Sequence, residues 1–287
     1  MSKTISKFLG ILLLLGLIVF SVNSYQANTV GGDLRLIILD IGQGDAILID
    51  TPERQQILTD GGRGTAILSE LAKVLPLSDK DLDLVISTHN DADHLGGLNE
   101  VLKHYQVDEV WLTGAVGTTK TYQAFLQLIA DNHIPVKKVM AGQTVKFGDL
   151  EGIVLSPLRS YDGATPSSQN ATSIVTYWQY GEQSFLLTGD AELAQEQELI
   201  SRGLLRRVDI LKVSHHGSHT ASGESFLKAI APKIAVISVG ASNQYGHPHQ
   251  EVINRLAKLK IPALRTDQSG RITFSVSLTD YSYTTLR

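Results

Sequence analysis

Short apolar runs that are rich in β-branched residues recur along the chain, and glycine-rich or polar turns separate them. Runs of this kind, about four to eight residues long, are typical of buried β-strands. The predicted strands are Leu34–Asp40, Ala46–Ile49, Gln56–Thr59, Leu84–Ser87, Val107–Leu112, Thr144–Phe147, Gly152–Leu155, Ser173–Tyr180, Ser184–Leu187, Ile210–Val213, Ile234–Ser238 and Ile272–Val276.

Other segments repeat their apolar residues at helical spacing, and Asp190 and Ser222 are suited to be N-caps. The predicted helices are Ala66–Val74, Tyr122–Ala130, Glu192–Ser201, Ser225–Ala231 and Glu251–Leu259. Strands come first in blocks and then alternate with helices, in two successive halves. This order predicts a layered α/β fold with its sheets sandwiched between helices. No repeat or linker interrupts residues 33–287, which we assign to one domain.

The segment before this domain, residues 1–27, has a different character. Lys3 and Lys7 precede an uninterrupted apolar run at residues 8–20, and a polar stretch follows. A basic start and a short apolar core predict a secretory signal peptide, because a membrane span usually needs about 20 apolar residues. A membrane anchor formed by the same run is the alternative. In both cases we expect a secreted or membrane-anchored, extracytoplasmic domain.

The composition narrows the chemistry. The chain has 287 residues, no cysteine and a net charge of −4. Without cysteine there is no disulfide framework, zinc finger, iron–sulfur cluster or thiol nucleophile. The acidic balance argues against general binding of polyanions, which needs clustered lysine and arginine. Seven of the nine histidines fall into three clusters, which are His89/His94, His215/His216/His219 and His247/His249.

The first histidine cluster follows a predicted strand. The sequence T-H-N-D-A-D-H-L-G-G places His89, Asp91, Asp93 and His94 on one tight loop. Four potential ligands at this spacing can point into one cavity and hold two cations. A divalent metal lowers the pKa of water and generates a nucleophile near neutral pH. A solvated polar turn is the alternative interpretation.

Two further strand ends carry the same residue types. Asp190 follows the predicted strand Ser184–Leu187, and His215 and His216 follow Ile210–Val213. Functional groups collect at the carboxyl ends of strands in layered α/β proteins, so we expect these side chains to meet at one edge. There the Asp190 carboxylate is placed to bridge two cations.

Two acidic residues also end earlier strands, namely Asp40 in D-I-G-Q-G-D-A and Asp60 in T-D-G-G. Two interpretations are open for these residues: each binds a metal directly, or each lies behind a metal ligand and hydrogen-bonds to it. We expect the second, because carboxylates commonly orient ligand histidines.

Together the motifs resemble the metallo-β-lactamase fold hydrolases, and more closely the hydrolase domain of ComEC-type competence proteins. The resemblance rests on D-I-G-Q-G-D-A, S-T-H-N-D-A-D-H-L-G-G, L-L-T-G-D, L-K-V-S-H-H-G-S, Y-G-H-P-H and R-T-D-Q-S-G-R-I, which span residues 40–272 in family order. It implies a four-layer αββα sandwich with a two-metal site at one edge of its paired sheets.

The candidate metal ligands under this resemblance are His89, Asp91, Asp93, His94, Asp190, His215 and His216. Spacing does not decide between the last two, and we expect His215 to complete the site of Asp93 and His94. Asp93 and His247 are the predicted catalytic residues, since an imidazole can protonate a leaving oxygen. For His247 a turn residue is the alternative.

The sequence departs from the family at two ligand positions. Asp91 stands where a second histidine is usual, and N-A-T-S, which runs from Asn170 to Ser173, lies about where another belongs. The site of His89 is therefore one ligand short, and Asn170, Ser173 and His219 are expected to contact substrate. Oxygen ligands favour harder ions, so we expect two divalent ions, zinc or manganese.

A bridged two-metal site suits phosphate-ester hydrolysis, because paired cations stabilise the attacking and leaving oxygens together. The resemblance implies a nuclease-type phosphodiesterase with DNA as substrate; another phosphodiester polymer, of the cell surface, is the alternative. A basic group flanks the strand before the histidine pair and favours DNA: Arg202, Arg206, Arg207 and Lys212. A catalytically weak metal-binding module of the same fold remains open, and the sequence identifies no protein partner.

Overall fold

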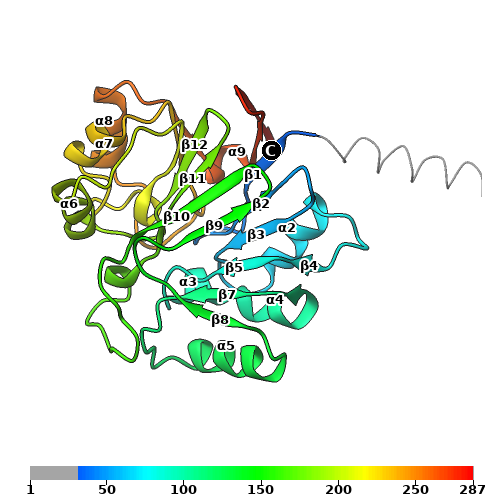
Figure 1. The fold of residues 1–287 in the computed structure, drawn as a ribbon. Coiled ribbons are helices and arrows are strands. Elements are labelled where there is room, and N and C mark those ends of the chain that lie inside the picture. The colour runs from blue at the N-terminus through cyan, green and yellow to red at the C-terminus, as the bar shows by residue number, and fades with distance from the viewer. Residues whose placement is uncertain (1–31, 287) are drawn as a thin grey trace, which may run out of the picture.

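A computed structural model describes residues 32–286, which form two large β-sheets packed face to face (Figure 1). The first sheet has eight strands, two of them from the end of the chain. In spatial order they are β17 (Tyr281–Leu286), β16 (Arg271–Val276), β1 (Leu34–Ile38), β2 (Ile47–Asp50), β3 (Gln56–Thr59), β5 (Leu84–Ile86), β7 (Val110–Leu112) and β8 (Val136–Lys138).

The second sheet has seven strands and lies against the first. Its order is β15 (Ala263–Arg265), β14 (Ile234–Ile237), β13 (Ile210–Lys212), β12 (Gln183–Leu187), β11 (Val175–Tyr180), β10 (Leu150–Ser156) and β9 (Thr144–Phe147). A short parallel pair, β4 (Asp81–Leu82) and β6 (Gln106–Val107), stands apart.

Helices cover the outer face of each sheet (Figure 1). On the first sheet they are α2 (Ala66–Val74), α3 (Ala92–Leu95), α4 (Leu98–His104) and α5 (Lys120–Asp131); on the second they are α6 (Leu193–Ser201), α7 (Glu224–Ile230) and α8 (Gln250–Lys258). Three apolar cores result, one between the sheets and one under each helical layer. β5 shows how alternation divides them: Leu84 and Ile86 face the other sheet, while Val85 faces the helices. The αββα sandwich is confirmed.

The parallel strands determine at which edge of the sheets the candidate site lies. β3, β5, β7 and β8 run parallel in the first sheet, as do β12, β13, β14 and β15 in the second. Each parallel step returns through a helical segment on the outer face, which brings the carboxyl ends of the strands to one edge. The loops at this edge carry most of the predicted site residues.

Two predicted N-caps are wrong. α6 is capped by Glu192, which forms a capping box with Gln195, and α7 is preceded by Gly223. Asp190 instead directs its carboxylate toward the histidines described below. The Val107–Leu112 run is also divided, because β6 pairs with β4 while β7 joins the large sheet.

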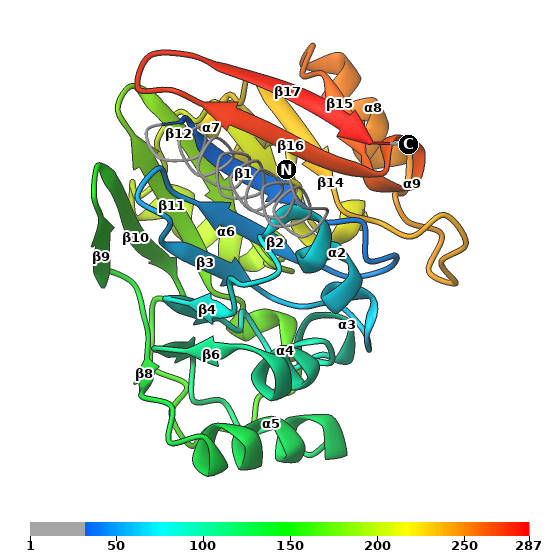
Figure 2. The same cartoon turned by 90° about the vertical axis from the view of Figure 1, so that its right-hand side faces the viewer.

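The predicted signal or anchor, residues 1–27 with its apolar run at 8–20, lies outside the described residues. No helix formed by residues 32–286 has the length and hydrophobicity that crossing a bilayer requires. Figure 2 shows the loop between β14 and α8, in orange, extending beyond the sheet edge on the site side.

Candidate metal centre

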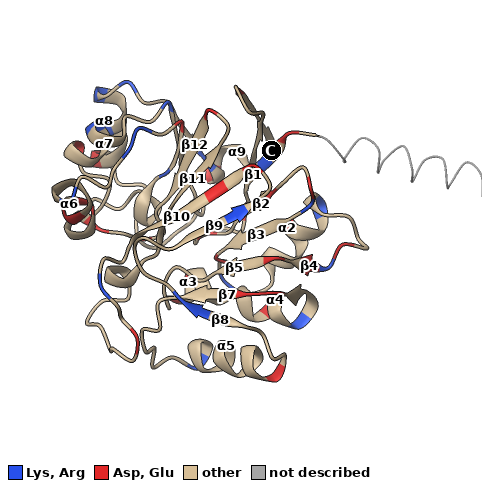
Figure 3. Cartoon of the chain, viewed as in Figure 1, with Lys and Arg blue, Asp and Glu red and all other residues tan. Residues whose placement is uncertain are grey.

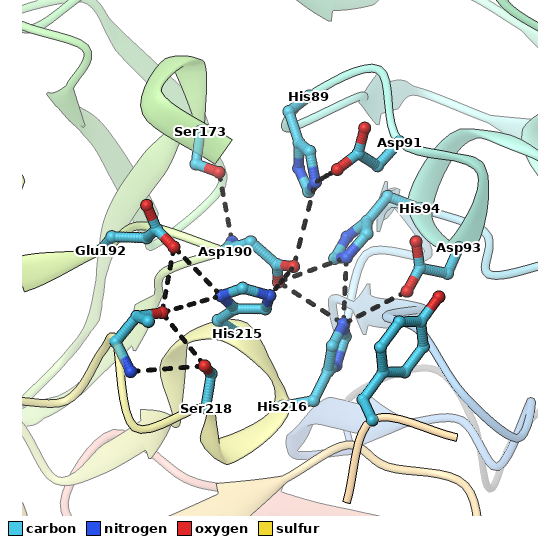
Figure 4. Close-up of polar contacts among 12 residues, drawn as sticks. His89, Asp91, Asp93, His94, Ser173, Asp190, Glu192, His215, His216 and Ser218 are labelled. Atoms are coloured by element: carbon cyan, nitrogen blue, oxygen red, sulfur yellow. Dashed lines mark hydrogen bonds and ion pairs between the residues drawn. The ribbon is translucent and has the colours of Figure 1, made fainter. Parts of the chain in front are cut away.

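A buried cluster of histidine and aspartate side chains lies at the shared strand edge (Figure 4). Ligand atoms of Asp45, His94, Asp190 and His216 all lie within 4.8 Å of one another. His94 Nε2 is 3.1 Å from His216 Nε2 and 3.2 Å from Asp190 Oδ1, and His216 Nε2 is 3.5 Å from the same oxygen. Asp93 lies beside them, with its Oδ2 at 3.8 Å from His216 Nε2.

Hydrogen bonds on the far side of both rings define their tautomers. His94 Nδ1 lies 2.8 Å from Asp60 Oδ2, and His216 Nδ1 lies 2.9 Å from the carbonyl oxygen of Ser238. Both partners are acceptors, so both Nδ1 atoms carry the proton and both Nε2 atoms present lone pairs. Two lone pairs and a carboxylate oxygen that converge in a buried space need a cation. These residues therefore fit a metal ion.

A second group of donors surrounds the other oxygen of Asp190. Thr88 Oγ1 donates to Asp60 Oδ2 at 2.7 Å and accepts from His89 Nδ1 at 2.9 Å, so His89 also presents a bare Nε2. That nitrogen lies 3.7 Å from Asp91 Oδ2 and 3.9 Å from Asp190 Oδ2. It is buried and has no hydrogen-bond partner among the described residues. Asp60 thus orients His94 directly and His89 through Thr88.

The histidine pair divides between the two groups. His215 and His216 lie in the 3-10 helix η2 (Ser214–Gly217), and both have left-handed backbone angles, with φ of 50° and 51°. His216 points to His94, whereas His215 Nε2 lies 3.7 Å from Asp190 Oδ2 and its Nδ1 lies 3.5 Å from Glu192. The expectation that His215 completes the site of Asp93 and His94 is therefore wrong, and His216 takes that place.

Charge explains the protonation of the cluster. Burial alone would lower the pKa of His94, but Asp190 and Asp60 raise it well above the ordinary value. The pKa of His216 is raised by Asp190 and Asp45 against the same effect of burial. Burial instead lowers the pKa of His89 well below the ordinary value, and His94 adds to this. The space between the Nε2 atoms of His94 and His216 therefore favours a positive charge, whereas His89 stays neutral.

Asp45 belongs to the cluster and was missed from the sequence. It lies in the same D-I-G-Q-G-D-A motif as Asp40, but Asp40 is exposed whereas Asp45 is buried, 3.3 Å from His216 Nδ1. The prediction that Asp40 lies behind a ligand is corrected: Asp45 has that position. Its other oxygen lies 2.5 Å from the buried ammonium of Lys212. Although burial raises the pKa of Asp45, Lys212 and His216 lower it to about 2.

Gly44 allows the D-I-G-Q-G-D-A motif to approach the loop that carries Asp93. A Cβ at Gly44 would lie 2.0 Å from the carbonyl oxygen of Asp93, and its φ is +126°. Asp45 N donates to that oxygen at 3.3 Å. Glycine is thus required here, and this requirement is the signal in the sequence that could have identified Asp45 as the closer acid.

The predicted substrate residues have different positions. Ser173 is fully buried, and its Oγ accepts a hydrogen bond from the backbone N–H of Asp190 at 3.2 Å, so it positions the bridging acid (Figure 4). Its expected contact with substrate is not supported by this position. Asn170 begins the 3-10 helix η1 (Asn170–Thr172) and is partly exposed. His219 is exposed and donates its backbone N–H to His249 Nδ1 at 3.1 Å.

His247 lies over the histidine pair, with its ring centroid 5.4 Å from that of His215 and 6.3 Å from that of His216. Burial and the neighbouring histidines lower its pKa to about 4. A neutral imidazole at physiological pH supplies a hydrogen bond, whereas the predicted general-acid role needs the protonated form. Its Nδ1 is buried and lacks a hydrogen-bond partner among residues 32–286.

The basic group predicted to favour DNA does not surround this edge. Lys212 is buried against Asp45, and Arg202, Arg206 and Arg207 precede β13, whose carboxyl end carries the site. Figure 3 shows acidic and basic residues interspersed over both halves of the described chain. These four residues therefore do not favour DNA as the substrate.

An αββα sandwich with this histidine and aspartate constellation at the shared strand edge defines a class, the metal-dependent hydrolases of the metallo-β-lactamase fold. The sequence profile of the Metallo-β-lactamase superfamily matches residues 39–241, and the chain belongs to this superfamily.

Among curated proteins, the chain is 34% identical to ComE operon protein 3 of Bacillus subtilis over 274 residues, which are 90% of this chain and 34% of that protein. It is 33% identical to Recombination protein 2 of Haemophilus influenzae over 240 residues, or 82% of this chain and 28% of that protein. The chain spans about a third of the length of these relatives. These likenesses agree with the predicted resemblance to competence proteins.

Solved structures share the fold at low identity. The metallo-β-lactamase fold protein YhfI from Bacillus subtilis has a TM-score of 0.54 at 15% identity and covers 81% of this chain and 96% of its own. Zn(2+)-bound PqqB from Methylobacterium extorquens has a TM-score of 0.55 at 12% identity, with coverages of 80% and 97%. At such identities the likeness shows the fold alone.

Proposed function

We propose that this chain is a two-metal phosphodiesterase that cleaves DNA outside the cytoplasm. One observation carries the proposal: the two carboxylate oxygens of Asp190 face different histidines. Oδ1 lies 3.2 Å from His94 and 3.5 Å from His216, while Oδ2 lies 3.7 Å from His215 and 3.9 Å from His89. A carboxylate flanked in this way is suited to bridge two cations.

Phosphodiester chemistry follows from the number and type of the ligands. Paired divalent ions lower the pKa of water and stabilise both the attacking and the leaving oxygen of a phosphate ester. Asp93 and His216 would hold one ion beside His94, and Asp91 would hold the other beside His89. His215 supplies a nitrogen where the sequence was one ligand short, which argues against a catalytically weak module. The carboxylates at Asp91 and Asp93 favour manganese, and the imidazoles are equally suited to zinc.

DNA is the proposed substrate because the similar curated proteins include one named Recombination protein 2 and one named Competence protein ComA. The predicted signal or anchor at residues 1–27 supports an extracytoplasmic location. A cell-surface phosphodiester polymer is the competing substrate, and the experiment below separates the two.

The test measures bound metal and hydrolysis on the same preparation of the full chain. We expect about two ions per chain after loading with manganese or zinc, and cleavage of bis(p-nitrophenyl) phosphate and of DNA. Asp190→Asn and Asp93→Asn should abolish turnover while the circular dichroism spectrum stays folded, and Asp131→Asn, an exposed acid at the end of α5, is the matched control. Absence of turnover in either metal refutes the hydrolase. Cleavage of poly(glycerol phosphate) but not of DNA refutes the nuclease.

A further inference from the structure

A row of rings leads from the candidate metal centre to the surface. The ring centroid of His247 lies 5.4 Å from that of His215, and Tyr245 stacks on His247 with centroids 5.6 Å apart and an interplanar angle of 25°. Tyr245 is 42% exposed, although its ring is large and mostly apolar. An exposed aromatic ring next to a catalytic centre is a platform for a flat ligand.

An arginine from the other half of the chain extends this platform. Arg63 lies on the exposed loop after β3 and donates from Nη2 to the Tyr245 hydroxyl at 3.2 Å, across 182 residues of sequence. A guanidinium has five N–H donors, so most remain available after this bond. Among residues 32–286 no carboxylate forms an ion pair with Arg63 within 4 Å. The guanidinium is therefore a ready donor for a phosphate oxygen.

The loop that carries Tyr245 is held in place by its own hydrogen bonds. Asn243 Oδ1 accepts from the backbone N–H of Tyr245 at 3.2 Å and of His247 at 2.9 Å, and its Nδ2 donates to the carbonyl oxygens of Gly240 and His247. Gly240 N in turn donates to Gln43 Oε1 at 3.3 Å, which fastens the loop to the one between β1 and β2 (Figure 2). This construction fixes the ring before any ligand binds.

The geometry points to a nucleotide subsite: we propose that Tyr245 stacks an unpaired base and that Arg63 binds an adjoining phosphate of the strand held at the metal centre. This rests on the proposed function and narrows its substrate to nucleic acid with accessible bases. Stacking on aromatic side chains is tolerant of sequence because every base has a π-face. A base within a duplex is already stacked, and a sugar-phosphate or glycerol-phosphate polymer has no base, so neither gains from the platform.

The test is equilibrium binding of labelled phosphorothioate oligothymidylate, which resists cleavage, to the metal-loaded full chain, and it requires no turnover. Tyr245→Ala should weaken binding about tenfold, while Tyr245→Phe, which keeps the ring, should stay near wild type. An oligomer of abasic residues should bind weakly to all variants. Arg63→Ala should weaken the binding of both oligomers and reduce the dependence of that binding on salt concentration. Tyr283→Ala, at an exposed tyrosine on β17, is the matched control.

The outcomes separate the subsite from the function. Equal binding of the two oligomers, or unchanged binding in Tyr245→Ala, overturns the subsite. The same ring-dependent binding without cleavage of any DNA keeps the subsite and refutes the nuclease. Cleavage of DNA by Tyr245→Ala at the wild-type kcat/KM keeps the nuclease and refutes the subsite.

Discussion

His94 and His216 face each other through their Nε2 atoms at 3.1 Å, although each ring already carries its proton on Nδ1. While both rings are neutral, neither can donate to the other in this tautomer, and the nearby oxygen of Asp190 adds negative charge. The space between the two nitrogens therefore attracts a cation, as the raised pKa values of both rings also indicate. This attraction accounts for the burial of so many polar atoms at one edge of the sandwich.

Removal of bound metal should therefore destabilise the fold. At a free metal concentration about 100 times the dissociation constant, binding contributes about 2.7 kcal/mol to the free energy of unfolding. We expect a chelator to lower the melting temperature of the wild type and to have a smaller effect on His216→Ala, which already lacks one of the facing nitrogens. Thermal unfolding followed by circular dichroism measures both. Identical melting temperatures with and without chelator would contradict the metal centre.

His215 and His216 should each contribute to binding a different metal ion. His216→Ala removes a ligand atom from the buried group of His94 and Asp190, so that ion should be lost. His215→Ala removes the more exposed ring beside Asp190 Oδ2 and should leave about one ion per chain. Inductively coupled plasma mass spectrometry of the dialysed proteins gives the stoichiometry, with exposed His104→Gln as control. A full complement of metal in His216→Ala would overturn the assignment.

Lys212 should be required for the stability of the site. Its ammonium and the Asp45 carboxylate are both 1% exposed, and they pair at 2.5 Å behind His216. Lys212→Met leaves a buried carboxylate without its partner, which costs about 3–5 kcal/mol of the free energy of unfolding. Urea denaturation measures this cost, and adding Asp45→Asn to Lys212→Met should recover most of it. A double variant as unstable as the single one would mean that the charge pair is not the cause.

The sequence predicted the parts of the site that are local. His89, Asp91, Asp93 and His94 share one loop, and the strand before it is recognisable from its apolar run. Because parallel strands end at a common edge, the position of Asp190 also followed from the strand pattern. Asp60 was predicted from its strand end in the same way.

The remaining features depend on contacts between distant segments or on backbone angles. The Asp45–Lys212 pair joins the loop before β2 to the last residue of β13 in the other sheet, and a lone lysine within a strand gives no sign that it is buried. Which of His215 and His216 faces His94 depends on their two successive left-handed backbone conformations, which non-glycine residues rarely adopt. For Ser173 the sequence shows only the position in the chain, whereas its role depends on the hydrogen bond to Asp190.

Glu196 should make stability depend on pH independently of the metal centre. Its buried carboxylate on α6 accepts from the backbone N–H groups of Ser222 and Gly223 at 2.6 and 2.8 Å, ahead of α7. Burial raises its pKa from 4.5 to about 7 against those bonds and the charge of Arg255. The folded state thus holds a proton that the unfolded state releases, so stability falls as pH rises from 4.5 to about 7. Over that window the advantage of the wild type over Glu196→Gln should shrink by about 3 kcal/mol, because the amide stays neutral throughout. Urea denaturation of both proteins across the window measures this, and curves that stay parallel would show that Glu196 has an ordinary pKa.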